Sequence, residues 1–271
     1  MQHLNHGVWR IIAGPVEPQP QPPLPLPRTA TVTSTQFAHL AHGPGVRLVA
    51  WPALVGLGAV VAVIVQALLV ARAGLPVLPV VALSGLGCLL GYPSGKIWYL
   101  VVNRRPLREF LPAGACIQGF LLAAMAVVTV GALVLDVPVG GILDATAPGI
   151  FLGMAIGRPG CFLTGCCAGR PTVSRWGLWS SDRRLGIRRI PVQLYEAAVA
   201  LAIGIAGLLL VLTTQSPFPG AVIVGTIAAY IFSRQLLFRL RSQSHTRVGR
   251  LITQAICAAL LLVVAAAYVV H

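Results

Sequence analysis

The chain has 271 residues, of which 56% are hydrophobic and 10% are charged. A soluble domain carries about 25% charged residues, so this composition excludes a water-soluble globular protein. The net charge of +14 comes from 20 Lys and Arg residues against 6 Asp and Glu residues, and nearly all of these cations are arginine. Arginine between membrane segments meets lipid phosphate, so we expect an anionic phospholipid as partner and no nucleic acid.

The first part of the chain, residues 1–45, is rich in Pro, Gln and Thr. This composition predicts an extended, disordered segment. It does not resemble a signal peptide, because the apolar stretch after Arg10 is too short to form the required core. We therefore expect a Pro-rich N-terminal segment followed by a membrane domain over 46–271, with one interfacial connection at 166–190.

Apolar runs of nearly 20 residues recur along the rest of the chain, and each is long enough to cross about 30 Å of hydrocarbon. The sequence predicts seven such spans, at about 48–71, 75–101, 111–135, 141–165, 191–213, 218–238 and 251–270. The expected fold is therefore all-α, a polytopic membrane bundle of about seven transmembrane helices.

Two of the predicted spans carry glycine at every fourth position. These glycines are Gly87, Gly91 and Gly95 in the second span and Gly149, Gly153 and Gly157 in the fourth. Small residues at this spacing let helix backbones approach closely in lipid. We therefore expect direct contact between the second and fourth helices.

The densest polar sequence lies where the fourth span ends, over residues 157–172. Arg158 lies only a turn or two inside that helix end, and an unpaired arginine in the membrane costs about 2.5 to 3.5 kcal/mol. Extension of the side chain to the interface would reduce this cost, and so would a bound anionic headgroup. The bound headgroup is the more specific of the two hypotheses, because it names a ligand for Arg158.

Polar residues also gather at the start of the fifth span and the end of the sixth. Pro191 suits a helix start, and Glu196 is the only carboxylate of the fifth helix, which favours pairing with an arginine. Arg234 follows Tyr230 by one helical turn, which places it inside the bundle. We expect guanidinium groups from the fourth and sixth helices to converge on one cavity sized for a phospholipid head.

Together these residues resemble the prolipoprotein diacylglyceryl transferase family. The family's pattern G-R-x-G-N-F, followed by a later G-R, is similar to 157–162 and 169–170 here. Its P-x-Q-L-Y-E resembles 191–196, and its D-x-x-A-P resembles 144–148. Its Y-x-x-x-R and following arginine are similar to Tyr230, Arg234 and Arg241. The resemblance covers about residues 85–241, and seven spans also agree with the family.

The resemblance implies a multi-pass enzyme of the bacterial plasma (inner) membrane. Such an enzyme moves a diacylglyceryl group from phosphatidylglycerol to the lipobox cysteine thiol of a preprolipoprotein in lipoprotein maturation, with no metal or organic cofactor. Carried over by position, Arg158 and Arg234 would be the catalytic residues that hold and polarise the lipid phosphate. The substrate-binding residues would be Gly157, Gly160, Cys161, Gly169, Arg170, Gln193, Tyr195, Glu196, Tyr230, Arg241 and Gln118.

The chain also departs from the family pattern. Gln118 stands where the family has a catalytic histidine, and a glutamine cannot accept a proton at neutral pH. Cys161 replaces an asparagine and Cys166 replaces an acidic residue. Either the positive field of the arginines ionises the substrate thiol and the family reaction proceeds, or the protein is a non-catalytic lipid-binding or accessory membrane protein that keeps the fold. A transporter or channel is disfavoured, because no internal repeat is evident.

Three cysteines, Cys161, Cys166 and Cys167, lie close together in the sequence. We expect no zinc site, because zinc needs four ligands and no histidine is near. A redox or acyl-accepting thiol and small packing residues are the remaining interpretations.

The distribution of arginine bears on orientation. The positive-inside rule would place the arginine-rich face in the cytoplasm. The family resemblance instead predicts that the loop after the fourth span is extracytoplasmic, and we follow the family.

Overall fold

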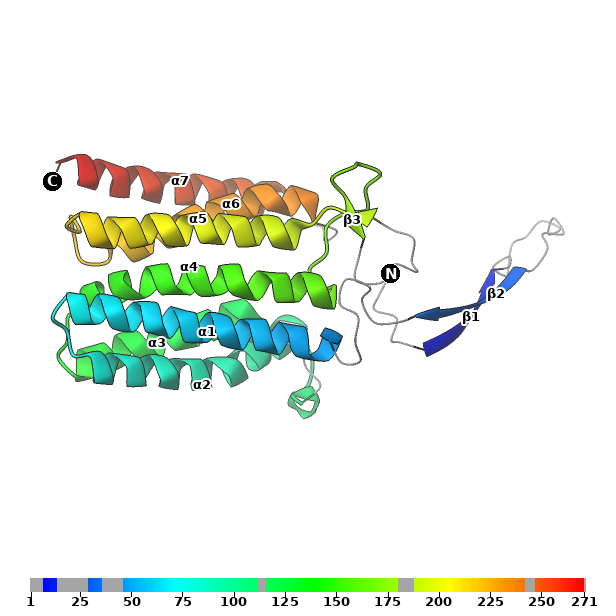
Figure 1. Ribbon diagram of the computed structural model, residues 1–271, viewed down its shortest axis with the longest axis horizontal. Coiled ribbons are helices and arrows are strands. Elements are labelled where there is room, and N and C mark those ends of the chain that lie inside the picture. The colour runs from blue at the N-terminus through cyan, green and yellow to red at the C-terminus, as the bar shows by residue number, and fades with distance from the viewer. Residues whose placement is uncertain are drawn as a thin grey trace.

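The computed structural model describes residues 7–13, 29–35, 46–111, 116–179, 188–241 and 247–270. In this part of the chain, seven helices are long and apolar enough to cross a membrane, and they lie side by side in one bundle (Figure 1). They are α1 (Val46–Arg72), α2 (Val77–Val102), α3 (Ile117–Val134), α4 (Val139–Thr164), α5 (Val192–Thr213), α6 (Ala221–Leu237) and α7 (Arg247–Val270). The predicted seven-helix membrane fold is confirmed.

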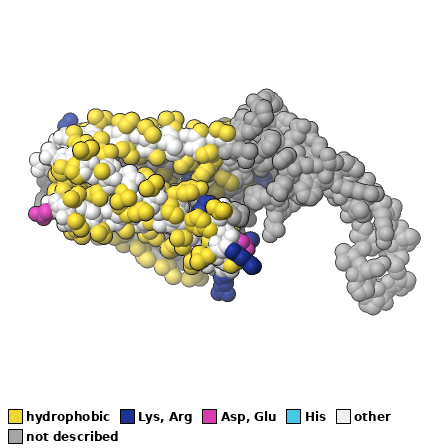
Figure 2. Space-filling view, turned by 90° about the horizontal axis from the view of Figure 1, so that it is seen from below, with side chains coloured by type: hydrophobic (Ala, Val, Ile, Leu, Met, Phe, Trp, Pro, Cys, Tyr) yellow, Lys and Arg dark blue, Asp and Glu magenta, His cyan; other side chains and the backbone are white. Residues whose placement is uncertain are grey.

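The helix boundaries follow the predicted spans except at the start of α3. That helix begins at Ile117 rather than near 111. Between α2 and α3, Pro106 precedes a short 3-10 helix, η1 (Leu107–Glu109). A second short 3-10 helix, η3 (Phe238–Leu240), follows α6. It lies at the end of the bundle where α4 and α6 finish, which we call the polar end. Hydrophobic side chains cover the flank seen in Figure 2, while Lys and Arg gather near one end of it.

Two small antiparallel hairpins accompany the helices. Strands β1 (Gly7–Ala13) and β2 (Thr29–Thr35) pair with Gly7 opposite Thr35, and β3 (Leu178–Trp179) pairs with β4 (Arg188–Arg189). Strands β1 and β2 lie within the N-terminal segment for which the sequence predicts disorder, and their β-branched residues favour strand pairing. The rest of the N-terminal segment lies outside the described residues, and disorder there stays a prediction.

The helix α4 lies inside the bundle and packs against α1, α5 and α6. Its glycines touch the backbone of α1: a Cβ atom added to Gly153 would lie 2.5 Å from the carbonyl oxygen of Gly58. The glycines of α2 instead face α3, where a Cβ on Gly91 would lie 2.9 Å from the ring of Phe120. The predicted glycine contact between the second and fourth helices is therefore wrong, because each repeat serves a different neighbour.

We expect Gly58→Ala to destabilise the bundle by about 1 to 3 kcal/mol, because the new methyl group would overlap the carbonyl oxygen of Gly153 and force α1 from α4. Gly56 provides a matched control on the same helix, since a Cβ there meets no atom within 4 Å. Gly56→Ala should be neutral or stabilising by about 0.5 to 1 kcal/mol. Unfolding of both variants in detergent micelles checks this, and equal stability of the two would contradict the packing described.

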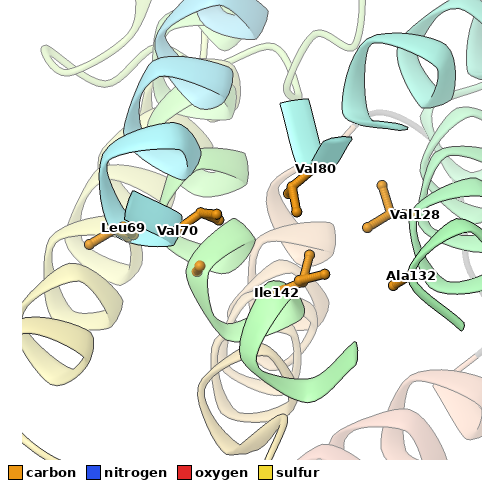
Figure 3. Close-up of a cluster of buried hydrophobic side chains, with 7 residues drawn as sticks. Leu69, Val70, Val80, Val128, Ala132 and Ile142 are labelled. Carbon is orange, nitrogen blue, oxygen red and sulfur yellow. The ribbon is translucent and has the colours of Figure 1, made fainter. Parts of the chain in front are cut away.

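A cluster of buried apolar side chains holds α1, α2, α3 and α4 together at the end opposite the carboxyl end of α4. Figure 3 shows these side chains meeting between the helices. The cluster consists of Leu69, Val70, Val80, Val128, Ala132, Ile142 and Ala145. This cluster stabilises the bundle at a distance from the polar end. The polar end therefore does not have to supply the main hydrophobic packing.

Asp144, the first residue of the D-x-x-A-P sequence, connects α4 to the start of α6. One carboxylate oxygen accepts hydrogen bonds at 3.0 Å from the Ser216 hydroxyl and the Gly220 N–H, and the other accepts one at 3.0 Å from the Ile223 N–H. A carboxylate at a helix amino terminus satisfies free N–H groups and complements the helix dipole. Asp144 therefore sets the position of α6, the helix that carries Tyr230 and Arg234.

Candidate functional site

The site is centred on Glu196, one turn into α5, whose side chain is fully buried. Its Oε2 atom lies 3.0 Å from Nη1 of Arg158 on α4, a close ion pair that is not aligned as a hydrogen bond. Its Oε1 atom accepts a hydrogen bond of 2.6 Å from Nη2 of Arg241, which follows α6 and η3. One carboxylate thus joins two arginines that are 83 positions apart in the sequence.

Arg158 lies in the last two turns of α4 and is 9% exposed. Its Nη2 donates a hydrogen bond of 3.1 Å to the hydroxyl oxygen of Tyr230 on α6. The Tyr230 ring in turn contacts Phe151, with ring centroids 5.5 Å apart. Packing between α4 and α6 therefore fixes the hydroxyl group that orients Arg158, and the guanidinium is held from two sides.

Arg241 is positioned by the loop after α4. The Arg170 N–H donates to the carbonyl of Leu240 at 2.8 Å, and the Arg170 Nε donates to the carbonyl of Arg241 at 3.0 Å. Gly169 lies beside this contact, and a Cβ on it would overlap the carbonyl oxygen of Ile190. Gly169 and Arg170 therefore join the ends of α4, α5 and α6, and the described contacts of Arg170 position Arg241.

Arg234 is the third guanidinium of the cluster. It lies on α6 one turn after Tyr230, within electrostatic reach of Arg158, Glu196 and Arg241. Its guanidinium lies 5.4 Å from the centre of the Phe238 ring, and Arg241 lies at the same distance from that ring. Its Nε atom is buried and has no hydrogen-bond partner among the described residues. Arg158 and Arg234 thus lie on the same side of the bundle, as the sequence led us to expect.

The charges of this cluster do not balance. Two guanidinium groups pair with one carboxylate and a third lies within electrostatic reach of it, so these four groups carry a net charge of +2 (three positive, one negative). Like charges held close together in a partly buried site repel one another unless an anion joins them. A phosphate group supplies the charge and the acceptor oxygens that the free N–H groups of arginine bind best. The arrangement is therefore suited to a phosphate-bearing anion.

The turn after α4 brings further polar groups to the same end. Gln193 is 3% exposed and its Nε2 donates a hydrogen bond of 2.7 Å to the backbone carbonyl of Cys166. The Cys166 sulfur lies 3.4 Å from the Thr164 hydroxyl oxygen and donates a hydrogen bond of 3.7 Å to the carbonyl oxygen of Cys161. In the described part of the chain, no group of three His, Cys, Asp or Glu side chains is arranged to hold a metal ion.

Several residues expected at the site have no described hydrogen bond or ion pair with the arginine cluster. Tyr195 is 39% exposed on α5, because one residue step along a helix turns its side chain away from the face that carries Glu196. Gln118 is exposed at the start of α3, where its described contact is with the Cys116 thiol at 4.0 Å. Gly157 and Gly160 face α1, so their role in the fold is helix packing.

The cavity expected around the arginines stays a prediction, and the structure describes a different cleft. A cleft of about 450 Å³ lies between α3, α4, α6 and α7, and its lining is almost entirely apolar. Ile227 and Ile231 of α6 line it. This cleft suits a hydrocarbon chain and cannot hold the charged headgroup.

Sequence reasoning missed two members of the cluster. Phe238, whose ring lies against both Arg234 and Arg241, follows Arg234 by four residues, and this spacing on a helix could have revealed it. Cys167 also lies within electrostatic reach of Arg158 and Arg241, although it belongs to a turn. No periodic pattern in the sequence identifies that proximity.

The chain is similar to several known proteins. The chain is 30% identical over 128 residues to the phosphatidylglycerol–prolipoprotein diacylglyceryl transferase of Dehalococcoides mccartyi, covering 42% of this chain and 49% of that protein. It is 25% identical over 162 residues to the protein of that name from Clostridium tetani, covering 56% and 65%. Over 178 residues it is 26% identical to phosphatidylglycerol–prolipoprotein diacylglyceryl transferase 2 of Clostridium perfringens, covering 60% and 67%.

The chain therefore spans about half to two thirds of the length of these relatives. The family match itself is longer and extends over residues 40–271, which includes all seven membrane helices and every arginine of the cluster. On this evidence the chain belongs to the prolipoprotein diacylglyceryl transferase family.

Proposed function

We propose that this protein transfers a diacylglyceryl group from phosphatidylglycerol to the thiol of a lipobox cysteine in a preprolipoprotein. The observation that carries the proposal is the cluster of Arg158, Arg234 and Arg241 around the single carboxylate of Glu196. The names of its relatives and its place in the family support the same reaction.

The proposed chemistry uses the charge of the cluster. The positive field of the arginines favours ionisation of the lipobox thiol, which releases its proton to water. When the resulting thiolate attacks the glyceryl carbon, a carbon–sulfur bond forms, the bond from that carbon to the phosphate oxygen breaks, and glycerol phosphate leaves with one additional negative charge. Guanidinium groups already held in place stabilise this charge better than water does, because they need no reorganisation. In this proposal Arg158 and Arg234 are catalytic and bind the phosphate, while Glu196, Tyr230 and Arg241 orient them.

The remaining residues take supporting roles in the proposal. Gln193 fixes the turn that carries Cys166, and Gly169 with Arg170 keeps Arg241 in place. We also infer that the protein resides in the bacterial plasma membrane and that the loop after α4 is extracytoplasmic.

A transfer assay tests the proposed function. Purified protein in proteoliposomes containing phosphatidylglycerol should convert a lipobox peptide into its S-diacylglyceryl form, detected as a mass increase on the cysteine. Vesicles of phosphatidylcholine serve as a control and should give no product. A properly folded wild-type protein that forms no thioether would contradict the proposal.

A second candidate function is a non-catalytic lipid-binding or accessory membrane protein. The family pattern predicts that Gln118 replaces a catalytic histidine, and loss of that proton acceptor would favour this function. The structure shows Gln118 exposed at the start of α3. Such a protein would bind phosphatidylglycerol through the same arginines without forming product. Native mass spectrometry, which counts bound lipid, combined with the transfer assay separates the two functions.

A further inference from the structure

The apolar cleft of about 450 Å³ between α3, α4, α6 and α7 opens at the surface of the bundle. Ile223, Ala228 and Cys257 in its lining are buried, whereas Ile256 and Leu260 of α7, which also line it, are 55% and 41% exposed. Because part of the lining is exposed, the cleft is open on one side. The surface of a membrane bundle faces lipid, so a molecule that fills the cleft enters from the bilayer.

The lining of the cleft selects hydrocarbon. Thr253 supplies the only hydroxyl group of the described lining, and that hydroxyl donates a hydrogen bond of 2.8 Å to the carbonyl of Gly249 within α7. The described lining contains no charged side chain. A dry cavity of about 150 Å³ with apolar walls binds benzene, which has six carbon atoms, so about 450 Å³ has room for on the order of 18 carbons. The cleft therefore has the volume of one acyl chain rather than two.

The cleft continues into the arginine cluster along α6. Ile227, Ile231 and Arg234 are spaced by four and three residues, a spacing that makes side chains neighbours on one face of a helix. Ile227 and Ile231 line the cleft, and the Nε atom of Arg234 is buried without a hydrogen-bond partner among the described residues. One face of α6 thus changes from hydrocarbon to guanidinium within a single turn. A phospholipid changes from acyl chain to phosphate in the same order.

The depth of the cleft matches one leaflet of a membrane. From Arg234 back to Ile223, at the far end of the lining, α6 spans about 16.5 Å. One leaflet contributes about 15 Å of hydrocarbon, half of the bilayer core of about 30 Å. On the opposite wall, α7 begins at the polar end and runs toward the far end of the bundle (Figure 1). Its lining residues from Thr253 to Leu260 cover about 10.5 Å of the same depth.

We propose that this cleft binds one acyl chain of the phospholipid whose phosphate lies at the arginine cluster. The inference rests on the proposed function, which places that phosphate beside Arg234. With the phosphate at Arg234 and one chain along Ile231 and Ile227, the diacylglyceryl group is held at both ends, and the second chain stays in the bilayer. The reacting carbon is then fixed beside the arginines. Holding a reactant in the productive geometry lowers the barrier of the transfer.

Photolabelling tests where the chain lies. The probe is phosphatidylglycerol with a photoreactive diazirine in the middle of one acyl chain, added at low content to phosphatidylcholine proteoliposomes that contain the full-length protein. After irradiation, peptide mass spectrometry should find the label at Ile227 and Ile231 well above its level at Leu89. Leu89 lies on α2, is 71% exposed, and reports the labelling expected from ordinary contact with the bilayer.

Two variants test the link between the cleft and the arginines. Arg234→Gln should lower labelling of Ile227 and Ile231 by about 10-fold, the effect of losing one charge-assisted hydrogen bond to phosphate. Arg239→Gln, at the same polar end, should leave the labelling unchanged. A phosphatidylcholine probe, whose choline cation the cluster repels, should label the cleft no more than Leu89. Equal labelling by the two headgroups, or no response to Arg234→Gln, would overturn the proposal, because the cleft would then hold any membrane lipid.

Filling the cleft provides a second test. Thr253→Trp places a large ring in the lining, and Ala255→Trp is the matched control, because Ala255 lies exposed on α7 outside the lining. Thr253→Trp should lower the labelling of Ile227 and raise the KM for phosphatidylglycerol by about 10-fold or more, as expected when the volume of a hydrophobic pocket changes. Ala255→Trp should match the wild type in both measurements. Wild-type labelling in a folded Thr253→Trp protein would contradict the assignment.

The outcomes separate this inference from the proposed function. A protein that shows headgroup-dependent labelling of the cleft but no lipid transfer would overturn the reaction and support the chain site. A protein that transfers lipid normally, with label spread evenly over exposed side chains, would overturn the chain site and support the reaction.

Discussion

Arg234→Gln is expected to lower lipid transfer by about 10² to 10³ while leaving the bundle as stable as the wild type. The loss in rate follows because a positioned donor to a developing phosphate charge contributes this much to catalysis. Stability should hold because Arg234 forms no hydrogen bond or ion pair among the described residues, and its removal relieves repulsion between three cations. Transfer rates and detergent unfolding of the same preparation check both parts.

The matched control for this variant is Arg239→Gln. Arg239 lies five residues further along, is exposed, and lies in η3 at the same polar end of the bundle. If transfer depends on the site rather than on the general positive charge of this face, the control should transfer lipid at nearly the wild-type rate. Equal losses in the two variants would show that Arg234 has no specific role.

The second large effect is expected for Glu196→Gln. This change leaves Arg158 and Arg241 buried without their counter-ion, and breaking a buried ion pair from one side costs about 3 to 5 kcal/mol. The bundle should therefore unfold at a much lower denaturant concentration, and transfer should fall with it. Anionic lipid should restore part of the lost stability by supplying the missing negative charge, which unfolding with and without phosphatidylglycerol measures.

Glu109 supplies the comparison, because its ion pair with Arg105 has the same 3.0 Å length as that of Glu196 with Arg158. The difference lies in burial: the side chains of Arg105 and Glu109 are 57% and 35% exposed. Water and salt screen an exposed pair, so Glu109→Gln should leave stability nearly unchanged. A similar loss in both variants would mean that burial does not decide the strength of these pairs.

Much of this architecture could be predicted from the sequence, because each span is a long apolar run and lipid leaves the backbone no alternative to a helix. The pairing of Glu196 with arginine was also predictable, since a lone carboxylate in an apolar helix needs a partner. Successive spans cross the membrane in opposite directions, so the fourth and sixth spans end on the same side of it. Arg158 and Arg234, which lie near those two ends, were therefore predictable on one side of the membrane. These features depend on local sequence and on the membrane.

Other features depend on which helices touch, and the sequence carries little information about that. The glycines of α2 and α4 have the same spacing, yet one set faces α3 and the other α1. Tyr195 and Gln118 were placed at the site by their position in a family pattern, and the structure shows both side chains exposed. The proximity of Cys167 to Arg241 arises from two connections meeting in space, which no single stretch of sequence encodes.

The length of α4 fixes the depth of the arginine cluster in the bilayer. From Val139 to Arg158 the helix rises about 29 Å, nearly the full thickness of a hydrocarbon layer of about 30 Å. Arg158 would therefore lie level with the glycerol and phosphate groups of one leaflet. A lipid could enter by lateral diffusion with its tails still in place, so the supply of substrate would follow the composition of that leaflet alone.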